Sequence, residues 1–360
     1  MTSTAAEAPK PMTDAKKKPR GVKCVVWDLD HTVWDGILLE DDHVELRPGV
    51  LDIIRELDQR GILQSIASRN DHDRAIERLR ALGIDEYFLH PQIDWNAKGQ
   101  NVERIAKKLN IGLDTFLFID DQPFEREEVA FACPAVRTLD AADLSGLLDL
   151  PELNPEFITD DSRQRRLMYR ADIERQQAEE GFAGPSEEFL RTLEMRFTLA
   201  PCSVDDLQRA EELTVRTNQL NTTGYTYDYA ELDAFRTSPG HVLLVAGLED
   251  RYGTYGKIGL SLVEKTAPGY WTVKLLLMSC RVMSRGVGTI MMSHVMNLAK
   301  AAGARLRAEF VPNGRNRMME VTYRFGGFRE VERRGEMILF EHDLAAIAPF
   351  PEYVRVDVSM

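Results

Sequence analysis

Short apolar runs alternate with amphipathic stretches through the first part of the chain. An unbroken run of this kind is typical of a strand that is buried on both faces of a parallel sheet. Between the runs, apolar residues recur at helical spacing in 47–61 and 101–112, which predicts amphipathic helices there. The alternation predicts an α/β domain with a parallel sheet over residues 21–150. The three apolar runs lie in 25–36, 63–71 and 115–127.

The pattern changes in the second half, where three strand-like runs follow one another with turn signals between them. This succession predicts an antiparallel meander. A helix over 284–303, a strand over 304–310 and a helix over 316–328 are expected to follow. We therefore expect an α+β second domain over residues 188–345. The runs of the meander lie at 241–247, 257–265 and 270–280.

The remaining segments are interpreted as two tails and a linker. Residues 1–20 lack the apolar centre of a signal peptide and are expected to form a flexible tail. Residues 151–187 are interrupted by Pro and Gly and predict a helical linker, and residues 346–360 are expected to form a C-terminal tail. An arginine cluster in the linker indicates either a solvated helix face or a docking surface for an acidic partner. This cluster consists of Arg163, Arg165, Arg166 and Arg170.

Composition narrows the possible function classes. With 360 residues, 44% of them hydrophobic and 29% charged, the chain is ordinary for a soluble globular protein with two sizeable cores. It contains no run of about 18 apolar residues, so no membrane span is predicted. The net charge of −13 argues against general nucleic-acid binding. The four cysteines show neither metal-ligand spacing nor a disulfide pattern, so a cytoplasmic location is expected.

The most informative motif follows the first apolar run, where Asp28 and Asp30 stand one residue apart. Alternate residues of a strand point the same way, so both carboxylates are expected just past its carboxyl end. Open α/β sheets place their chemistry at that edge. Two carboxylates held close together favour a cation between them or a proton on one of them. The motif therefore predicts a Mg²⁺ site or a pair of acid and nucleophile, with a merely solvated loop as the alternative.

Other chemically useful side chains follow the later runs. Ser68 ends the second run and Lys98 begins a helical stretch, while Asp120 and Asp121 end the third run. Taken singly, a strand-end cap explains Ser68 and a surface lysine explains Lys98 just as simply. Together with the first motif, the set supplies a nucleophile, a hydroxyl and a cation for phosphate oxygens, and a second acidic pair for a metal.

This ordered set resembles the haloacid dehalogenase (HAD) superfamily of phosphohydrolases over residues 22 to 140. The resemblance implies that Asp28 attacks phosphorus to form an aspartyl-phosphate, and that Asp30 protonates the leaving oxygen and then activates water. Ser68 and Lys98 would hold the phosphoryl group. The implied cofactor is Mg²⁺, bound by Asp28, the backbone carbonyl of Asp30 and Asp121, with Asp120 beside them. One helix occupies the stretch between Asp30 and Ser68, so the domain is expected to be capless.

The second half resembles the acyl-CoA N-acetyltransferase (GNAT) fold, in which a strand, a basic Gly-rich turn and a helix N-terminus cradle the pyrophosphate of coenzyme A. The turn of that fold reads R/Q-x-x-G-x-G/A. From Arg285 this sequence reads R-G-V-G-T-I, with Ile290 in the place of the last small residue. Because the small residue lets the backbone approach the pyrophosphate, this departure argues against ordinary acetyl-CoA binding.

Cys280 lies where the last run of the meander meets this turn. Arg281, Arg285 and the following helix N-terminus would lower the pKa of its thiol from the usual value of about 8.5, which makes it a candidate nucleophile. A small buried hydrophobe is the alternative for Cys280. That alternative is preferred for the other three cysteines, Cys24, Cys133 and Cys202.

Six motifs spread over both halves belong together: WDLDHTVWDGILLEDD, SIASRNDHD, FIDDQPFERE, TNQLNTTG, LLMSCRVMSRGVG and GRNRMMEVTYRFGGF. The combination resembles the FkbH-like family, the HAD subfamily IIIC glyceryltransferase/phosphatases of polyketide extender-unit biosynthesis. The resemblance implies that the protein captures the acyl group of 1,3-bisphosphoglycerate on a cysteine and removes the remaining phosphate. The glyceryl group would then pass to the phosphopantetheine thiol of an acyl carrier protein, for methoxymalonyl-type extender units.

The cysteine that would carry the acyl group is assigned by elimination and from its neighbours in the sequence. Several relatives carry a cysteine shortly after the first aspartate pair, where this chain reads ILLEDD, so Cys280 is the candidate here. Residues that could bind the pantetheine arm or the glyceryl group are Asn218, Gln219, Asn221, Arg281 and Arg285. The three amide side chains fit a turn and a helix cap equally well.

Two other functions stay open. The chain can be a stand-alone Mg²⁺-dependent phosphatase of a small phosphorylated metabolite, with a second half that serves as a lid or a dimerisation module. It can also be an acyltransferase on a degenerate phosphatase scaffold. The intact aspartate, serine and lysine set of the first half argues against the degenerate scaffold.

Overall fold

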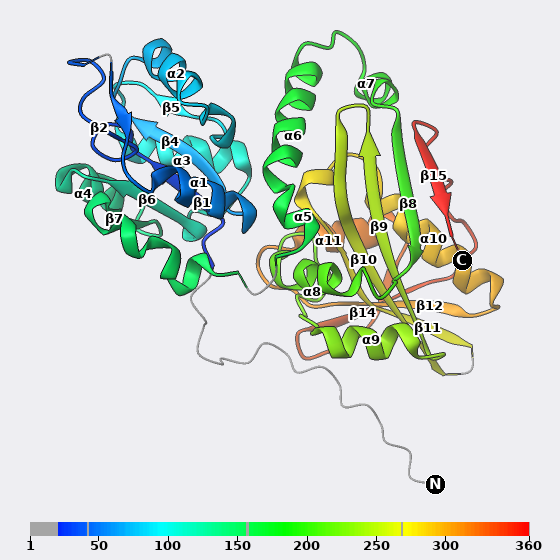
Figure 1. Cartoon of the computed structure of the whole chain (residues 1–360). Coiled ribbons are helices and arrows are strands. Elements are labelled where there is room, and N and C mark those ends of the chain that lie inside the picture. Colours follow the sequence, from blue (N-terminus) through cyan, green and yellow to red (C-terminus); the bar gives the residue numbers. More distant parts are fainter. Residues whose placement is uncertain (1–20, 42, 156–157, 268, 360) are drawn as a thin grey trace. The chain divides into compact units, whose positions relative to one another are not determined.

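The chain forms two compact units that divide between Ile173 and Glu174 (Figure 1). The computed structural model describes residues 21–41, 43–155, 158–267 and 269–359. The tail expected at 1–20 lies outside the described residues. Among the helices within those ranges, none is long and apolar enough to cross a membrane.

The first unit contains a parallel five-stranded sheet between two layers of helices. Its elements are β1 (Cys24–Trp27), β2 (Trp34–Asp35), β3 (Glu45–Leu46), α1 (Val50–Gln59), β4 (Leu63–Ser68), α2 (His72–Ala81), β5 (Gln92–Ile93), α3 (Lys98–Leu109), β6 (Phe116–Asp120), α4 (Pro123–Ala132) and β7 (Arg137–Asp140). The strand order is β5-β4-β1-β6-β7, as expected for an α/β domain. Only the short β2–β3 pair and α1 lie between β1 and β4, in agreement with a capless domain.

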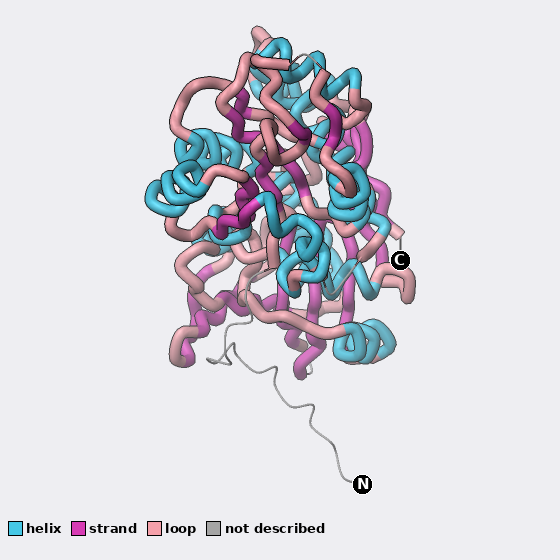
Figure 2. The backbone as a smooth tube through the Cα atoms, turned by 60° about the vertical axis from the view of Figure 1, so that its left-hand side comes forward, coloured by secondary structure: helices cyan, strands magenta, loops and turns pink. Residues whose placement is uncertain are grey.

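The strand residues alternate between two cores. Val25 and Trp27 of β1 pack with α1 and α2 on one face of the sheet. Cys24 and Val26 pack with α3 and α4 on the other face. Because helices cover both faces of the sheet (Figure 2), every position along β1, β4 and β6 is buried and these strands are mostly apolar. Charged residues are therefore confined to the ends of these strands.

The second unit contains a mixed eight-stranded sheet in the order β13-β14-β12-β11-β10-β9-β8-β15. Its strands are β8 (Met195–Pro201), β9 (His241–Asp250), β10 (Gly253–Ala267), β11 (Tyr270–Met278), β12 (Arg305–Phe310), β13 (Arg329–Arg334), β14 (Met337–His342) and β15 (Val354–Val358). Strands β9, β10 and β11 form the antiparallel meander predicted from the sequence. The second unit thus has the α+β architecture that was expected.

Helices cover both faces of this second sheet. Helices α7 (Ser186–Thr192), α10 (Val287–Ala301) and α11 (Arg317–Phe325) contribute to the larger core. Helices α8 (Leu207–Arg216) and α9 (Tyr229–Thr237) pack on the opposite face. The predicted helices at 284–303 and 316–328 correspond to α10 and α11, which begin one to three residues later.

The C-terminal segment differs from the sequence prediction. Residues 346–360 were expected to form a tail, but residues 354–358 form β15, which pairs in parallel with β8 from Val354↔Met195 to Val358↔Leu199. Side chains of Ile347, Phe350 and Tyr353 also pack against the larger core. The partner strand lies far away in the sequence, so no local pattern reveals the pairing.

The predicted linker is helical and contains α5 (Asp160–Arg163) and α6 (Arg165–Glu180). Two of the clustered arginines are used within the first unit: Arg166 binds Asp58 at 3.0 Å, and Arg165 donates to the carbonyl of Gly61. In the second unit, Arg175 of α6 is 1% exposed and makes a two-pronged ion pair with Asp250, at 2.6 and 3.0 Å. Arg166 is thus tied down by a half-buried ion pair in the first unit and Arg175 by a buried one in the second, which differs from a fully solvated face.

Replacing Arg175 by methionine is expected to lower the free energy of unfolding by about 3–5 kcal/mol. The substitution removes the guanidinium that stacks on Tyr255 and leaves the fully buried Asp250 carboxylate without its ion-pair partner. Urea unfolding followed by circular dichroism measures the change. Arg191→Met is the matched control because the pair of Arg191 with Glu187 is exposed, so it should leave the unfolding curve nearly unchanged. Equal curves for the two variants would contradict the structural role of Arg175.

Candidate active site at the strand ends of the first unit

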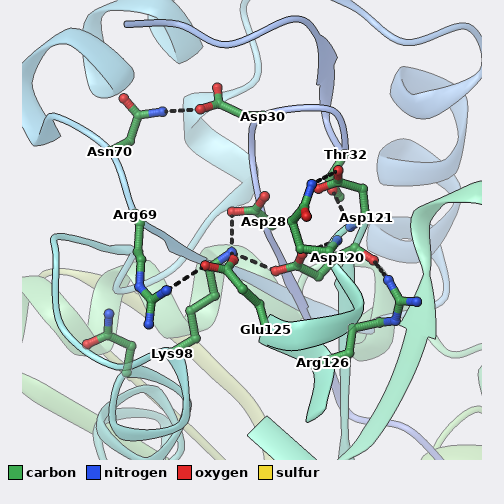
Figure 3. Close-up of polar contacts among 12 residues, drawn as sticks. Asp28, Asp30, Thr32, Arg69, Asn70, Lys98, Asp120, Asp121, Glu125 and Arg126 are labelled. Carbon is green, nitrogen blue, oxygen red and sulfur yellow. Dashed lines mark hydrogen bonds and ion pairs between the residues drawn. The ribbon is translucent and has the colours of Figure 1, made fainter. Parts of the chain in front are cut away.

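Three of the predicted residues meet where strands β1 and β6 end. These neighbouring strands pair in parallel up to Trp27↔Ile119, so the residues that follow, Asp28 and Asp120, lie side by side. Lys98, the first residue of α3, points between them (Figure 3). Its Nζ lies 2.7 Å from Asp28 Oδ1 and 2.6 Å from Asp120 Oδ2. The neighbouring ends of the two strands thus bring together three predicted residues: the candidate nucleophile Asp28, the acidic residue Asp120 and the cation Lys98.

A fourth member of the cluster is Glu125, in the first turn of α4, whose carboxylate also contacts Lys98 Nζ. Oxygen atoms of Asp28, Asp120 and Glu125 all lie within 4.8 Å of one another. A hard divalent cation such as Mg²⁺ prefers oxygen ligands of this kind, so the donor set fits the implied metal. The sequence interpretation missed Glu125, although an acidic residue in the first turn of the helix after a strand-end aspartate was a usable signal.

The side chains of the other two predicted metal-binding residues, Asp30 and Asp121, have other partners. The Asp30 carboxylate accepts hydrogen bonds from Trp34 Nε1 at 2.8 Å, the Leu38 amide at 3.1 Å and Asn70 Nδ2 at 3.0 Å. Figure 3 shows it turned toward Asn70 and away from Lys98. Asp121 accepts a hydrogen bond from the Gln122 side chain at 2.6 Å. The resemblance gave the metal only the backbone carbonyl of Asp30, and the acid–base role of its carboxylate stays a prediction.

Burial dominates the electrostatics of the cluster. Burial raises the pKa of Asp28, and burial together with the Asp28 charge raises the pKa of Asp120 from 3.8 to about 7. Burial alone would lower the pKa of Lys98, but the adjacent carboxylates hold it above its usual value. The ammonium therefore stays charged, and the carboxylates exceed it in number, which favours a second cation or a bound proton.

This excess of carboxylates predicts a pH dependence of stability in the absence of metal. A carboxyl whose pKa is higher in the folded than in the unfolded chain binds more protons when folded, so the free energy of unfolding should fall as pH rises from 3.8 to about 7. Urea unfolding at a series of pH values, with a chelator and then with Mg²⁺, measures this slope. Bound Mg²⁺ should flatten it, and so should Asp120→Asn. A slope that neither change affects would show that other groups cause it.

Ser68 supplies a hydroxyl beside this cluster. It is the last residue of β4, is 1% exposed, and its Oγ makes no hydrogen bond of normal geometry with the described residues. The neighbouring hydroxyl also favours the charged form of Asp28, against the larger effect of burial on that pKa. A buried hydroxyl without a strong partner beside Asp28 has the capacity to donate to an oxygen of a phosphoryl group.

Two arginines that were not predicted support the site. Arg69 follows Ser68 and binds Glu125 and Glu128, each at 2.8 Å, so it fixes one oxygen of Glu125 while Lys98 contacts the other (Figure 3). Arg126 donates to the backbone carbonyl of Asp120 at 2.8 Å. Arg69 follows Ser68 and Arg126 follows Glu125 in the sequence, and the positive charge of these two residues was the available signal.

Three of the four cysteines are buried, and Cys280 differs from them. Cys24, Cys133 and Cys202 are buried, as expected for small hydrophobes. Burial raises the pKa of Cys133 to about 11 and that of Cys202 to about 12, so these thiols are poor nucleophiles. Burial also raises the pKa of Cys24 well above its usual range. Cys280 is half-buried and begins a short 3-10 turn after β11.

The basic groups expected to activate Cys280 have other partners. Arg281 donates to the backbone carbonyl of Tyr255 at 2.8 Å, and Arg285 forms an ion pair with Glu179 at 3.1 Å. Helix α10 begins only at Val287. The lowered pKa of the Cys280 thiol stays a prediction from the sequence.

The amide residues divide into two groups. Asn218 and Gln219 are exposed, whereas Asn221 is fully buried. The Asn221 side chain accepts hydrogen bonds from the amides of Thr223 at 3.1 Å and Gly224 at 2.8 Å. This geometry is the turn that was the alternative interpretation of Asn221. Its backbone forms an antiparallel bridge with Leu277, so Asn218 and Gln219 lie toward the end of β11 at which Cys280 stands.

Comparison with known families agrees with the geometry of the first unit. The sequence profile of one family, described as haloacid dehalogenase-like hydrolase, matches residues 34–125. The first unit contains a HAD-like hydrolase domain. The matched range includes Ser68, Lys98 and Asp120 and begins just after the Asp28 and Asp30 motif. Comparison with functionally curated proteins gives no match.

Solved structures resemble parts of the chain. The N-terminal part of the protein BF1531 from Bacteroides fragilis, which contains a phosphatase domain complexed with Mg, is 27% identical with a TM-score of 0.34, and the match covers 39% of this chain and 43% of that one. The ribosomal-protein-S18-alanine N-acetyltransferase of Escherichia coli is 13% identical with a TM-score of 0.33, covering 40% and 92%. The GNAT domain of S. lividans PAT is 18% identical with a TM-score of 0.33, covering 40% and 88%. The chain thus spans less than half of the BF1531 fragment.

Proposed function

We propose that this chain captures the glyceryl group of 1,3-bisphosphoglycerate on Cys280, removes the remaining phosphate in the first unit and passes the glyceryl group to the phosphopantetheine thiol of an acyl carrier protein. The observation that supports the phosphatase step is the buried cluster in which Lys98 joins Asp28, Asp120 and Glu125. The combination of a HAD-like domain with a GNAT-like unit and the six sequence motifs supports the transfer step.

In the phosphatase step, an oxygen of Asp28 attacks phosphorus and the bond from phosphorus to the leaving oxygen breaks. Asp30 turns from its present donors and gives that oxygen a proton. It then takes a proton from the water that attacks the aspartyl-phosphate, which releases inorganic phosphate and restores Asp28. Ser68 and Lys98 hold the phosphoryl oxygens. Mg²⁺ bound by Asp28, Asp120 and Glu125 would neutralise charge on the phosphoryl group.

In the acyl-transfer step, the thiolate of Cys280 attacks the carbonyl carbon of the acyl phosphate. The bond from that carbon to the phosphate oxygen breaks, and phosphate leaves with the electron pair. Because phosphate is a good leaving group, this thioester forms with little further catalysis. The thiol of the carrier protein later replaces Cys280 by thioester exchange and returns the thiol of the enzyme.

A stand-alone phosphatase is the second candidate function. It is favoured by one observation: the guanidinium groups of Arg281 and Arg285, which were expected beside Cys280, are bound by Tyr255 and Glu179. In that case the first unit would hydrolyse a small phosphorylated metabolite by the same aspartate chemistry, and the second unit would take no part in the reaction.

Intact-protein mass spectrometry distinguishes the two candidates. After incubation with Mg²⁺ and freshly generated 1,3-bisphosphoglycerate, the wild-type protein should gain a glyceryl-sized or phosphoglyceryl-sized adduct that Cys280→Ala lacks. Cys202→Ala is the matched control, since that thiol is buried, and it should keep the adduct. An adduct that persists in Cys280→Ala would assign the acyl group to another residue. Phosphate release from simple esters without any adduct would favour the stand-alone phosphatase.

A further inference from the structure

Two parallel strands of the second unit separate along their length. β11 pairs with β12 from Tyr270↔Arg305 to Val273↔Ala308, and β11 then continues to Met278 without a strand partner on that side. Facing strand edges without a partner can accept an extended molecule as an added strand. We call the space between residues 274–278 and 309–310 the strand gap.

The strand gap leads toward the Gly-rich turn before α10. The GNAT-like fold implies coenzyme A with its pyrophosphate at this turn, and the turn directly follows β11. An extended arm that starts at the turn would therefore run into the strand gap. Whether the chain can hold coenzyme A depends on what occupies these two places.

The strand gap is filled by residues 220–223 of the chain itself. The amide of Thr222 donates to the Leu276 carbonyl at 3.0 Å, and the amide of Met278 donates to the Leu220 carbonyl at 2.9 Å. On the other side, the amide of Val311 donates to the Thr222 carbonyl at 2.9 Å. The segment thus bonds to β11 and to the residue that follows β12, in the position of an added strand.

Buried side chains fix this segment in place. Thr222 Oγ1 accepts a hydrogen bond from the Leu276 amide at 3.0 Å. The side chain of Asn316, 1% exposed, donates to the backbone carbonyls of Asn221 and Val311, each at 2.9 Å. Asn221 and Thr222 are both fully buried. Displacing the segment would leave several buried polar groups without partners, which is costly.

The turn before α10 is covered as well. Gly286 has a left-handed backbone (φ 79°), and a Cβ added there would lie 2.7 Å from Tyr353 Oη and 3.3 Å from Pro351 Cγ. Side chains from the C-terminal segment therefore occupy the side of the turn that a small residue would leave open. Ile290, in the place of the last small residue of the motif, is fully buried.

We propose that the second unit has no coenzyme A site, because residues 220–223 occupy the strand gap and residues 351–353 cover the turn. In the proposed function the acyl acceptor is the thiol of a carrier protein. Because the strand gap is filled, that thiol approaches Cys280 from the end of β11 where Asn218 and Gln219 are exposed. This statement about the acceptor rests on the proposed function, whereas the absence of a coenzyme A site does not.

Amide hydrogen exchange of the full chain, with and without millimolar coenzyme A, tests the proposal. We expect slow exchange for the amides of Thr222, Met278 and Val311, and no change at these amides or at residues 284–290 when coenzyme A is added. Faster exchange in 220–223 with coenzyme A would mean that the cofactor displaces the segment, and slower exchange at 284–290 would mean that it binds the turn. Either result would overturn the proposal.

Asn316→Ala calibrates this experiment. Without the Asn316 amide, exchange of residues 220–223 should become faster in the absence of any ligand, which shows that the measurement reports the packing of the segment. If this variant does not fold, the comparison of the wild-type protein with and without coenzyme A still decides the question.

A second experiment tests the identity of the acyl acceptor separately from the proposed function. Protein loaded with the glyceryl group should transfer it to a carrier protein but not to free coenzyme A. Equal transfer to coenzyme A would overturn the assignment of the acceptor. Failure of the protein to load at all would count against the proposed function, while hydrogen exchange would still judge the coenzyme A site.

Discussion

Asp28→Asn should reduce Mg²⁺-dependent phosphate release by on the order of 10⁴-fold or more, the scale expected when a covalent nucleophile is lost. The amide cannot form the phosphoryl-enzyme, and its NH₂ group next to Lys98 replaces an ion pair at 2.7 Å. Phosphate release from phosphoglyceryl and simple phosphate esters, measured with and without Mg²⁺, gives the ratio. In the proposed reaction, the same variant should accumulate protein or carrier that bears a phosphorylated acyl group.

Two comparisons make this result specific. Asp73→Asn changes a fully exposed carboxylate of the same unit and should keep wild-type activity. Circular dichroism shows whether Asp28→Asn is folded. Substantial phosphate release by folded Asp28→Asn would rule out covalent catalysis at this residue, and release of free glyceryl-carrier by that variant would contradict the order of steps.

Lys98→Met should both inactivate and destabilise the first unit. The ammonium is 1% exposed and bonds to Asp28 and Asp120, so its removal leaves buried carboxylates uncompensated, at a cost of about 3–5 kcal/mol. Because a divalent cation can balance the same charges, Mg²⁺ should restore more stability to the variant than it adds to the wild type. Thermal unfolding with chelator and with Mg²⁺ measures both effects.

Lys107→Met is the matched control because it removes an exposed lysine from the same helix α3. It should unfold like the wild type in both conditions. If Lys98→Met were as stable as Lys107→Met without Mg²⁺, the buried cluster would not depend on the ammonium, and the role assigned to Lys98 would fail.

Most residues that meet at the strand ends of the first unit could be predicted from the sequence, and the reason is physical. Neighbouring parallel strands end at one edge of the sheet, so residues at or just after the ends of β1, β4 and β6 must converge there. Asp28, Ser68 and Asp120 do so. Glu125 and Arg69 were missed because their roles depend on how α4 is oriented against the end of β4, which is a tertiary relation. The rotation of Asp30 toward Asn70 likewise depends on contacts that no spacing reveals.

For the second unit, the sequence predicted the helices and strands better than the tertiary contacts between them. The meander and α10 follow from local periodicity, which a single sequence displays. By contrast, the insertion of 220–223 between β11 and β12 is a contact among three distant segments. From the sequence, Asn221 was a candidate for binding a ligand. In the fold its side chain closes a turn and its backbone forms a bridge with Leu277. The sequence could not distinguish ligand binding from turn formation, because both use the same side-chain amide.

The parallel pairing of β15 with β8 has a consequence for synthesis of the chain. β8 is the first strand of its sheet to leave the ribosome, yet its outer edge is completed only by residues 354–358. Until then the nascent second unit exposes a row of unpaired backbone groups, the kind of edge that recruits other chains. Pairing over so long a stretch of sequence is also slow. Products that stop before Val354 should therefore aggregate, and chaperones that bind nascent chains should improve the yield of the full-length protein.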